Sequence, residues 1–317
     1  MEDDQQDQNQ NKIIDSNIKK GFTNFGNTCF YNATLQCLFR CTKLINKLKD
    51  YKQPVENQDG STIVKSTGLK LLKYLQITIE DYYLKPQVEE IGPVLLLRSY
   101  REMNQNYIGG TQDCARECLT YFIDNFIDAS KKEDIHIAEL FDCDLKSEIT
   151  CPLCNNRTES NAPEKVITLP IKDQKTFEDA MNLFLNDEKL DDDNKYNCEK
   201  CNQKVNANKK LIIKKTPEYL FIALKRFEFE YIKQINKIRA SKINDDIIMP
   251  NVTTINGIAY ELKGCIYHMG NLNGGHYVYY HKFNTQWVEF NDDIICDEQN
   301  MNKIINKGYI YFYERVE

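Results

Sequence analysis

The chain has 317 residues, 41% of them hydrophobic and 11% aromatic, which excludes an intrinsically disordered protein and supplies enough apolar side chains for a substantial core. Its 47 acidic and 41 basic residues are interspersed and leave a net charge of −6, which argues against a nucleic-acid-binding protein. No apolar run approaches the roughly 18 residues that a membrane-spanning helix needs, so we expect no membrane association.

The N-terminal segment differs in composition from the rest of the chain. Residues 1–20, MEDDQQDQNQNKIIDSNIKK, are acidic and rich in amides, and they lack apolar periodicity. We therefore predict a flexible polar tail, and no secretory signal peptide, since the basic and then apolar pattern is missing. The remaining length fits either one large multi-lobed domain or two ordinary domains.

Residues 21–36, GFTNFGNTCFYNATLQ, place a cysteine directly before an apolar helical pattern. The pattern favours one face of an amphipathic helix, with Leu35, Leu38, Phe39, Ile45 and Leu48 on that face. Cys29 is thus expected at a helix N-terminus, where backbone amides and the helix dipole stabilise a thiolate. Gly26 allows a tight turn that exposes the thiol, and Asn24 offers an amide to a developing oxyanion. Cys29 is a candidate nucleophile; the commoner alternative is a buried structural cysteine.

Two further helices are predicted in the first part of the chain. Apolar periodicity favours helices over 68–79, GLKLLKYLQITI, and over 112–127, QDCARECLTYFIDNFI. The first 130 or so residues are therefore expected to be mostly helical.

Residues 141–215 carry two Cys-x-x-Cys pairs, Cys151 with Cys154 in CPLC and Cys198 with Cys201 in CEKC. Such pairs are typical of a tetrahedral, structural zinc site, although free thiols or a redox pair are alternatives. The other cysteines show no regular spacing. This usage favours a reducing compartment, the cytoplasm, the nucleus or both, over a disulfide framework.

The second half of the chain reads as strands of an antiparallel sheet. Short aromatic and β-branched segments alternate with Gly, Asn and Asp turns, as in LFIALKRFEF, YELKGCIYH, HYVYYHKF, QWVEF and YIYFYERV.

Four histidines are available as a base for Cys29. His276 lies in NLNGGHYVYYHKF, where two glycines leave room for a ligand backbone and a strand pattern follows. An acceptor is needed to orient the imidazole, and the stretch WVEFNDD supplies Asn291, Asp292 and Asp293. Alone, this acidic stretch would read as a solvated turn. The remaining histidines are expected to be structural: His136, His268 and His281.

Together these stretches resemble a known family. GFTNFGNTCFYNATLQCL resembles the cysteine box of the ubiquitin-specific proteases, and GGHYVYY followed by WVEFNDD resembles their histidine box. TPEYLFIALKRFEF and GYIYFYERV resemble two further strands of the same domain. The resemblance runs from about residue 21 to 315, with the motifs in the family's order.

The resemblance implies an α+β, papain-like cysteine protease fold in a single catalytic domain, residues 21–316. An α-helical thumb would span about 21–140, zinc-braced β fingers about 141–215 and a β-sheet palm about 216–316. The segment 228–250 is expected to form a mobile loop near the cleft.

The same resemblance assigns roles to individual residues. It implies that Cys29 is the nucleophile and His276 the general base. Asn291 would orient the histidine with Asp292 beside it, and Asn24 would complete the oxyanion hole. Gly274 and Gly275 would line a channel that admits only the Gly-Gly end of ubiquitin.

One family motif is altered. The family opens a helix with two glutamines and an aspartate, and the matching positions here hold Gln112, Asp113 and Cys114. Gln112 and Asp113 are taken as substrate-binding residues. Because a cysteine replaces the acid, the grip on the tail of the modifier is expected to differ, and Cys114 is either a second exposed thiol or a packing residue.

The leading hypothesis is a thiol-dependent ubiquitinyl hydrolase that cleaves the bond after ubiquitin's C-terminal glycine through a thioester. Its partners would be ubiquitin and ubiquitinated proteins, without nucleic acid, and the enzyme would be a monomer. Two alternatives are kept: a catalytically weak ubiquitin-binding adaptor, and a protease for another ubiquitin-like modifier.

Overall fold

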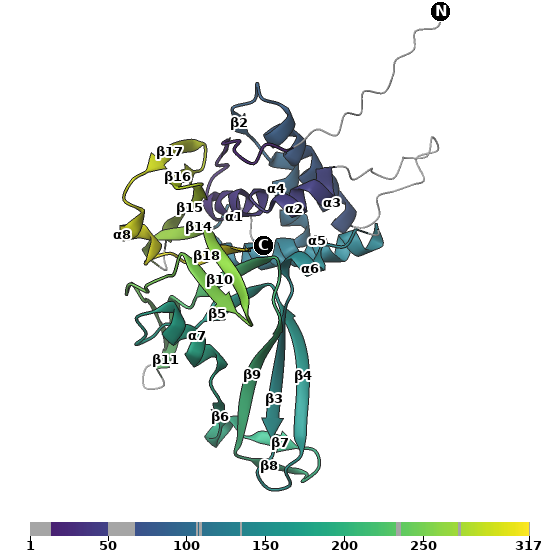
Figure 1. The fold of residues 1–317 in the computed structure, drawn as a ribbon, viewed down its shortest axis with the longest axis vertical. Helices are drawn as coiled ribbons and strands as arrows, with labels where there is room; N and C mark the ends of the chain where they lie inside the picture. The colour runs from purple at the N-terminus through teal and green to yellow at the C-terminus, as the bar shows by residue number, and fades with distance from the viewer. Residues whose placement is uncertain are drawn as a thin grey trace, which may run out of the picture.

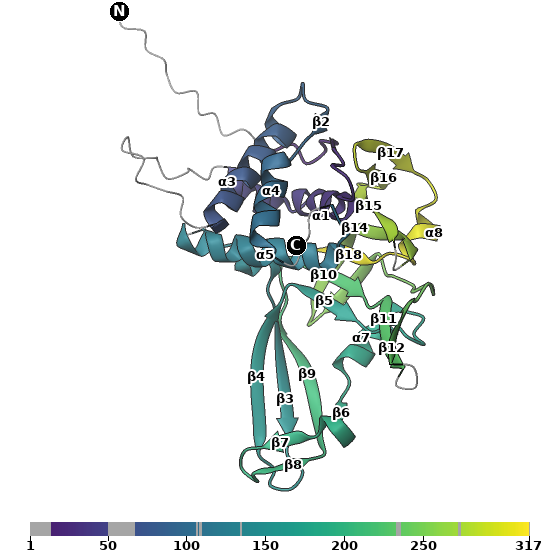
Figure 2. The same ribbon diagram turned by 180° about the vertical axis from the view of Figure 1, so that it is seen from behind.

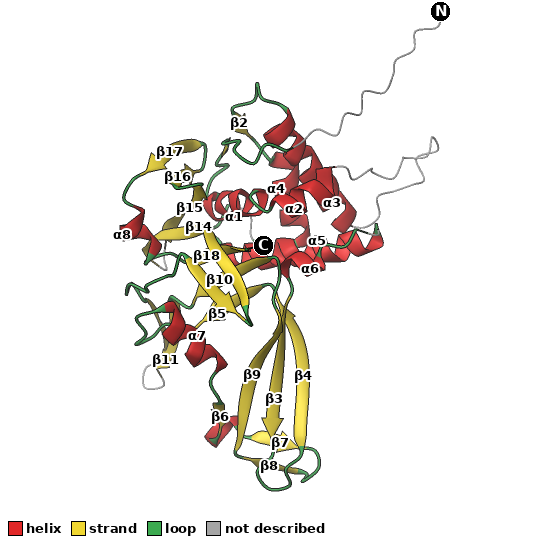
Figure 3. Ribbon diagram, viewed as in Figure 1, coloured by secondary structure: helices red, strands yellow, loops and turns green. Residues whose placement is uncertain are grey.

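The computed structural model describes residues 14–49, 67–105, 107, 110–133, 135–232, 236–271 and 274–316. Helices gather in the upper part of Figure 1, a twisted sheet lies beside them, and a long narrow sheet extends below. Figure 3 shows the same division by secondary structure. Most of the predicted N-terminal tail, residues 1–13, lies outside the described residues.

The first 141 residues supply the helical part. Its helices are α1 (Cys29–Phe39), α2 (Thr42–Lys49), α3 (Thr67–Ile79), α4 (Val94–Met103), α5 (Ala115–Lys132) and α6 (Ala138–Phe141), with a π-helical segment at Glu80–Leu84. Strands β1 (Gly21–Phe22) and β2 (Glu90–Ile91) pair in parallel beside them. Helices α3 and α5 lie where periodicity predicted them. Helix α4 was not predicted, because its run of four apolar residues hides the helical period.

The pattern after Cys29 was predicted as one amphipathic helix, and this is wrong. Helix α1 ends before Arg40, and all eleven of its residues are buried. Helix α1 packs between the other helices and strand β15 (Gly274–Phe283), so it is a core helix. Its polar side chains are bonded inside the core: Gln36 Nε2, for example, donates to the carbonyl of Lys20 at 2.7 Å.

The twisted sheet is eight-stranded, in the order β17-β16-β15-β14-β18-β10-β5, with β13 also pairing with β14. The strands are β5 (Val166–Leu169), β10 (Tyr219–Leu224), β13 (Val252–Ile255), β14 (Ile258–Asn271), β15 (Gly274–Phe283), β16 (Gln286–Asn291), β17 (Ile294–Glu298) and β18 (Ile310–Arg315). We call it the palm sheet. Four of the five predicted strand segments lie in β14, β15, β16 and β18. The fifth, LFIALKRFEF, divides between β10 and β11 (Phe227–Ile232), a strand outside this sheet.

The central strands of the palm sheet are buried on both faces. Alternate residues of a strand point to opposite faces, so Phe221 of β10 packs with the helices while Ile222 packs in a second apolar cluster with α7 (Phe177–Leu185) and α8 (Met301–Ile305). This double burial explains why YLFIAL is continuously apolar.

The long narrow sheet extends away from the core and has the order β4-β3-β9-β6. Its strands are β3 (Cys143–Thr150), β4 (Arg157–Glu164), β6 (Glu188–Leu190) and β9 (Ala207–Lys215), and a hairpin of β7 (Tyr196–Cys198) and β8 (Gln203–Val205) forms its tip, after a 3₁₀ turn at Asp192–Asn194. We call this part the fingers. The predicted finger segment 141–215 also supplies β5 and α7, which pack with the palm sheet.

A second hairpin projects from the palm beside α7, best seen in Figure 2. Strands β11 (Phe227–Ile232) and β12 (Lys237–Lys242) pair antiparallel, so the prediction of a loop over 228–250 is wrong for these residues. No helix among the described residues is long and apolar enough to cross a membrane.

Candidate active site

Cys29 begins α1 directly after a tight turn. Gly26 and Asn27 adopt left-handed backbone conformations with φ of 86° and 55°. The turn is closed by Asn24, whose Oδ1 accepts hydrogen bonds from the amides of Gly26 at 2.9 Å and Thr28 at 3.3 Å. Because the first amides of a helix lack intrahelical partners, this position favours an anion on the Cys29 sulfur. The expectation that the turn exposes the Cys29 side chain is wrong for the free protein, because the residue is only 3% exposed.

His276 of β15 contacts both Cys29 and Asn291. Its Nε2 lies 2.7 Å from Oδ1 of Asn291, the last residue of β16. The hydrogen bond with Cys29 is the largest influence on His276 and raises its pKa to about 9; burial opposes the rise, while Asn291 and the charges of Cys29 and Asp292 add to it. The elevated pKa of His276 favours the imidazolium at neutral pH.

Asp292 joins the palm to the turn that carries Cys29. Its Oδ2 accepts from Asn24 Nδ2 at 2.7 Å, and its Oδ1 accepts from Asn32 Nδ2 at 2.8 Å. The Asp292 carbonyl also accepts from the Phe22 amide at 2.8 Å. The bonds to Asn24 and Asn32 fix the position of the turn before Cys29. Asp292 Oδ2 also lies 3.9 Å from His276 Nε2, which places a carboxylate near the imidazole. Asn32 was not predicted as a site residue, because nothing in the sequence distinguishes it from other polar residues of a helix.

Gln112 spans from the segment before α5 to β15. Its Nε2 donates to the Gly275 carbonyl at 2.7 Å, and its Oε1 accepts from the Gly275 amide at 3.0 Å. A Cβ on Gly275 would overlap His268 Nε2 and the Met269 carbonyl, whereas a Cβ on Gly274 would lie 3.9 Å from its nearest neighbour, Gln112. Gly275 is therefore sterically required in the free protein, and Gly274 is not.

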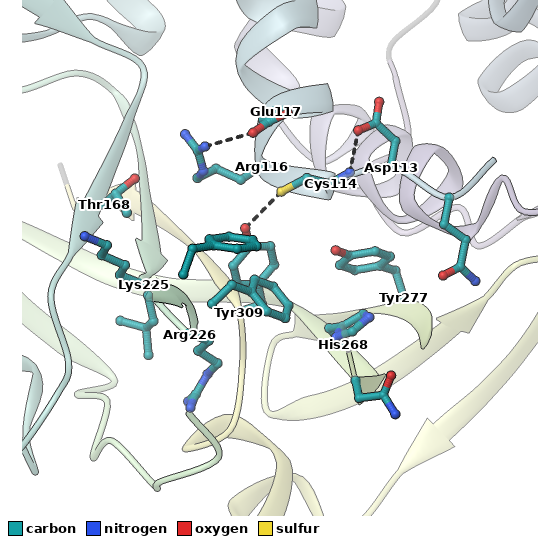
Figure 4. A pocket seen from close by; sticks show the side chains of 15 residues that line it. Asp113, Cys114, Arg116, Glu117, Thr168, Lys225, Arg226, His268, Tyr277 and Tyr309 are labelled. Carbon is teal, nitrogen blue, oxygen red and sulfur yellow. Dashed lines mark hydrogen bonds and ion pairs between the residues drawn. The ribbon is translucent and has the colours of Figure 1, made fainter. Parts of the chain in front are cut away.

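Asp113 is engaged within the helical part. Its Oδ1 accepts from the Cys114 amide at 2.7 Å, and its Oδ2 accepts from the Tyr100 hydroxyl at 3.3 Å. The sulfur of Cys114 lies 3.0 Å from the Tyr309 hydroxyl, and Figure 4 shows it pointing toward that ring. Cys114 is thus a half-buried side chain with a hydroxyl partner.

An open pocket of about 740 Å³ separates the helical part from the palm beside these residues. Gln112, Cys114, Tyr277 and Tyr309 are among its lining residues, so it begins next to Gly275 and His276. His268 also lines it, although the sequence analysis expected only a structural role. Burial, Lys242 and His276 lower the pKa of His268 to about 4, so its ring is neutral. The place of His268 near the site follows from the register of the β14–β15 hairpin, in which the next residue, Met269, pairs with His276.

The two Cys-x-x-Cys pairs meet at the tip of the fingers, at the opposite end of the molecule from α1. All four sulfur atoms lie within 4.8 Å of one another. The sulfurs of Cys151 and Cys201 are 3.8 Å apart, and those of Cys154 and Cys198 are 3.7 Å apart. Zinc–sulfur bonds of about 2.3 Å in a tetrahedron place the sulfurs about 3.8 Å apart. The cluster therefore has the geometry to hold a metal ion.

Comparison with known proteins places this site in a family. The family model described as ubiquitin carboxyl-terminal hydrolase matches residues 20–313. The chain is 28% identical to Usp2 of Drosophila melanogaster, over 93% of this chain and 34% of that protein, and 29% identical to human ubiquitin carboxyl-terminal hydrolase 42, over 94% and 23%. It spans about a third or less of these relatives. It is 27% identical to ubiquitin carboxyl-terminal hydrolase 8 of Saccharomyces cerevisiae, over 92% and 70%.

Solved structures agree with the sequence comparison. A chain from the SAGA DUB module Ubp8/Sgf11/Sus1/Sgf73 bound to monoubiquitin superposes with a TM-score of 0.75 at 28% identity, covering 94% of this chain and 69% of that one. A chain from the same module bound to ubiquitin aldehyde superposes with a TM-score of 0.73 at 25% identity, covering 96% of this chain and 71% of that one. The expected α+β fold is confirmed. The chain belongs to the ubiquitin carboxyl-terminal hydrolase family, and within it to the ubiquitin-specific protease type that its cysteine and histidine boxes resemble.

Proposed function

We propose that this chain is a cysteine isopeptidase that hydrolyses the bond after the C-terminal glycine of ubiquitin on modified proteins or ubiquitin chains. The observation that carries the proposal is the His276 imidazole, whose Nε2 lies 2.7 Å from Asn291 Oδ1 and whose pKa is raised above all by its interaction with Cys29. The pocket lined by Gln112 and Tyr277 supports the proposal, because Gln112 is hydrogen-bonded to Gly275 and Tyr277 directly follows His276, so an extended modifier tail in this pocket would lie beside the histidine.

The chemistry follows from these positions. The Cys29 thiolate attacks the carbonyl carbon of the modifier's last glycine, and the amides at the start of α1, with Asn24, stabilise the oxyanion. The His276 imidazolium donates its proton to the leaving lysine amine as the C–N bond breaks, which leaves a thioester on Cys29. The neutral imidazole then takes a proton from water, whose oxygen attacks the thioester and frees the Cys29 sulfur.

The test uses ubiquitin that carries a fluorogenic aminocoumarin amide at its C-terminus, with SUMO and NEDD8 substrates in parallel. We expect release from ubiquitin and much slower release from the other two. Binding of ubiquitin without turnover would favour the adaptor alternative. Faster cleavage of SUMO or NEDD8 would mean that the enzyme prefers another modifier, and would point to Cys114, where the family carries an acid, as the cause.

The pH dependence of the reaction is predicted from His276. Because its pKa is raised to about 9, the imidazolium persists through neutral pH and is lost as the pH rises through about 9. We expect kcat/KM on the amide substrate to fall on the basic side near that value, measured between about pH 5 and pH 10. Asn291→Ala removes one of the bonds that raise the pKa and should move the basic limb to lower pH. A basic limb near pH 6.5 in the wild type would contradict the assignment.

We also propose that the four-cysteine cluster holds a structural zinc ion, supported by its sulfur spacing and by its distance from Cys29. Removing the metal with a chelator should increase hydrogen exchange in β7 and β8, measured by mass spectrometry, because metal binding is part of the folding free energy of such sites. Cys154→Ser should reproduce the effect and lower the zinc content. Equal protection of the finger tip with and without metal would contradict the proposal.

The reducing compartment, cytoplasm or nucleus, stays a proposal. It is supported by the twelve cysteines, all of which lie in the described part of the chain and none of which forms a disulfide there. A monomer is likewise proposed, and light scattering of the purified chain would test it.

A further inference from the structure

Lys242, at the end of β12, is hydrogen-bonded to the end of β14. Its Nζ lies 2.7 Å from the His268 carbonyl, 3.0 Å from the Gly270 carbonyl and 3.1 Å from His268 Nδ1. An ammonium has three N–H donors, so these contacts use all of them. Strand β12 pairs only with β11 among the described strands, so Lys242 joins a separate hairpin to the palm sheet.

The end of β14 is the direct partner of the strand that carries His276. Met269 pairs with His276, and Gly270 pairs with Gly275. The two strand ends are packed too closely to admit an added methyl group. A Cβ on Gly270 would lie 2.6 Å from the Gly274 carbonyl, and a Cβ on Gly275 would overlap the His268 ring. A shift of residues 268–270 must therefore move Gly275, and with it the neighbouring His276.

The bond to Nδ1 also fixes the state of His268. Because the ammonium donates to Nδ1, the neutral ring carries its proton on Nε2, the nitrogen that lies against Gly275. The ring is held further by Tyr277, at 4.5 Å between centroids, and by Phe227 of β11, at 5.5 Å. Figure 4 shows His268 and Tyr277 side by side at the pocket wall. Lys242 thus orients the ring that supports Gly275.

We propose that Lys242 is a positioning residue that fixes the end of β14 and thereby holds His276 in register with Cys29 and Gly275 in register with Gln112. It acts through His268 and Gly270, since its hydrogen bonds go to these two residues and to neither Cys29 nor His276. The turnover readout rests on the proposed function, but the proposal has a second readout that needs no ubiquitin.

That readout is the alkylation of Cys29 by iodoacetamide, in which the thiolate sulfur displaces iodide. Its rate at neutral pH reports how well His276 supports the thiolate. The rate is measured as a function of pH by mass spectrometry of the peptide that contains Cys29, which separates it from the other cysteines. The groups that face His276 are Cys29, Asp292 and His268, so the profile is read as that of the cluster.

The test compares wild type, Lys242→Met and Lys237→Met. Lys237 lies on the same strand and is exposed, so its substitution is the matched control. We expect Lys242→Met to slow Cys29 alkylation near pH 7 and to lower kcat on the ubiquitin amide about 10- to 100-fold, with a smaller change in KM, because displacement by about 1 Å costs up to about 100-fold. Lys237→Met should stay within about twofold of wild type on both readouts.

Three results would overturn the proposal. A raised KM with wild-type kcat and alkylation would mean that Lys242 contacts the modifier tail and does not position His276. Wild-type values on both readouts would mean that the three hydrogen bonds have no catalytic consequence. Loss of both Cys29 alkylation and turnover in Lys237→Met as well would mean that any disturbance of the hairpin causes the defect.

Thermal unfolding of each variant shows whether it is folded. Lys242→Arg keeps the charge and the N–H donors toward the two carbonyls, so it should recover most of the alkylation rate. A folded Lys242→Arg with the full defect of Lys242→Met would contradict positioning through these bonds. If wild type cleaves no ubiquitin substrate, the proposed function fails, while the alkylation comparison still decides the role of Lys242.

Discussion

Cys29→Ala is expected to lower turnover of a ubiquitin amide substrate by at least about 10⁴-fold, because alanine cannot form the thioester on which the pathway depends. The fold should survive, since Cys29 is a small buried side chain at the start of α1 and alanine is a good helix former. The measurement is kcat on ubiquitin aminocoumarin at a single pH, with ubiquitin affinity measured separately by fluorescence anisotropy.

The binding measurement separates an enzyme from an adaptor. Retained ubiquitin affinity with lost turnover would show that the substitution removed the chemistry and not the docking surface. Cys296→Ala is the matched control, because Cys296 is an exposed thiol on β17, and its loss should leave turnover within about twofold. Residual activity of a tenth of wild type in Cys29→Ala would place the nucleophile elsewhere, and Cys114 in the pocket would be the next thiol to replace.

The sequence predicts the parts of the site that depend on short segments. Cys29 begins a helix after a Gly-Asn turn, His276 follows two glycines in a strand, and Asn291 ends the next strand, and each is visible within about ten residues of sequence. The structure adds that Nε2 of His276 lies 2.7 Å from Asn291. The finger cysteines are a similar case, because the spacing within each pair already restricts the ligand geometry.

The supporting contacts could not be predicted, because they join segments that are far apart in sequence. Asn32 reaches Asp292 across 260 positions, and Gln112 reaches Gly275 across 163. No sequence pattern around an asparagine or a glutamine predicts which distant residue its side chain will contact. Their positions follow only when the helical part has packed against the palm sheet through α1 and β15.

The β11–β12 hairpin was mistaken for a loop for a different reason. Its apolar side chains alternate, as expected for a strand, but Phe229, Tyr231 and Ile238 are 56–69% exposed. The segment also carries the charges and amides that usually mark loops. Pairing between the two strands, and the anchor that Lys242 provides at one end, keep this hairpin ordered in the described residues.

Gly275→Ala is expected to reduce kcat/KM for a ubiquitin substrate by about 100-fold or more and to lower the free energy of unfolding by about 1–3 kcal/mol. The added methyl group would overlap His268 Nε2 and the Met269 carbonyl, and a carbonyl in a paired strand cannot move independently of its ladder. The end of β15 must then shift, which pulls Gly275 from Gln112 and moves His276 away from Cys29. Urea unfolding and steady-state kinetics measure the two effects.

Gly274→Ala is the matched control for this steric argument, because its methyl group would have no neighbour closer than 3.9 Å. In the free enzyme it should leave both stability and Cys29 alkylation close to wild type, whereas Gly275→Ala should impair both. With ubiquitin substrates Gly274→Ala should raise KM, since the methyl group would enter the space that the modifier's glycines need. Equal loss of alkylation in the two variants would mean that the glycine pair serves backbone conformation, and that the close packing of Gly275 against His268 does not set the position of His276.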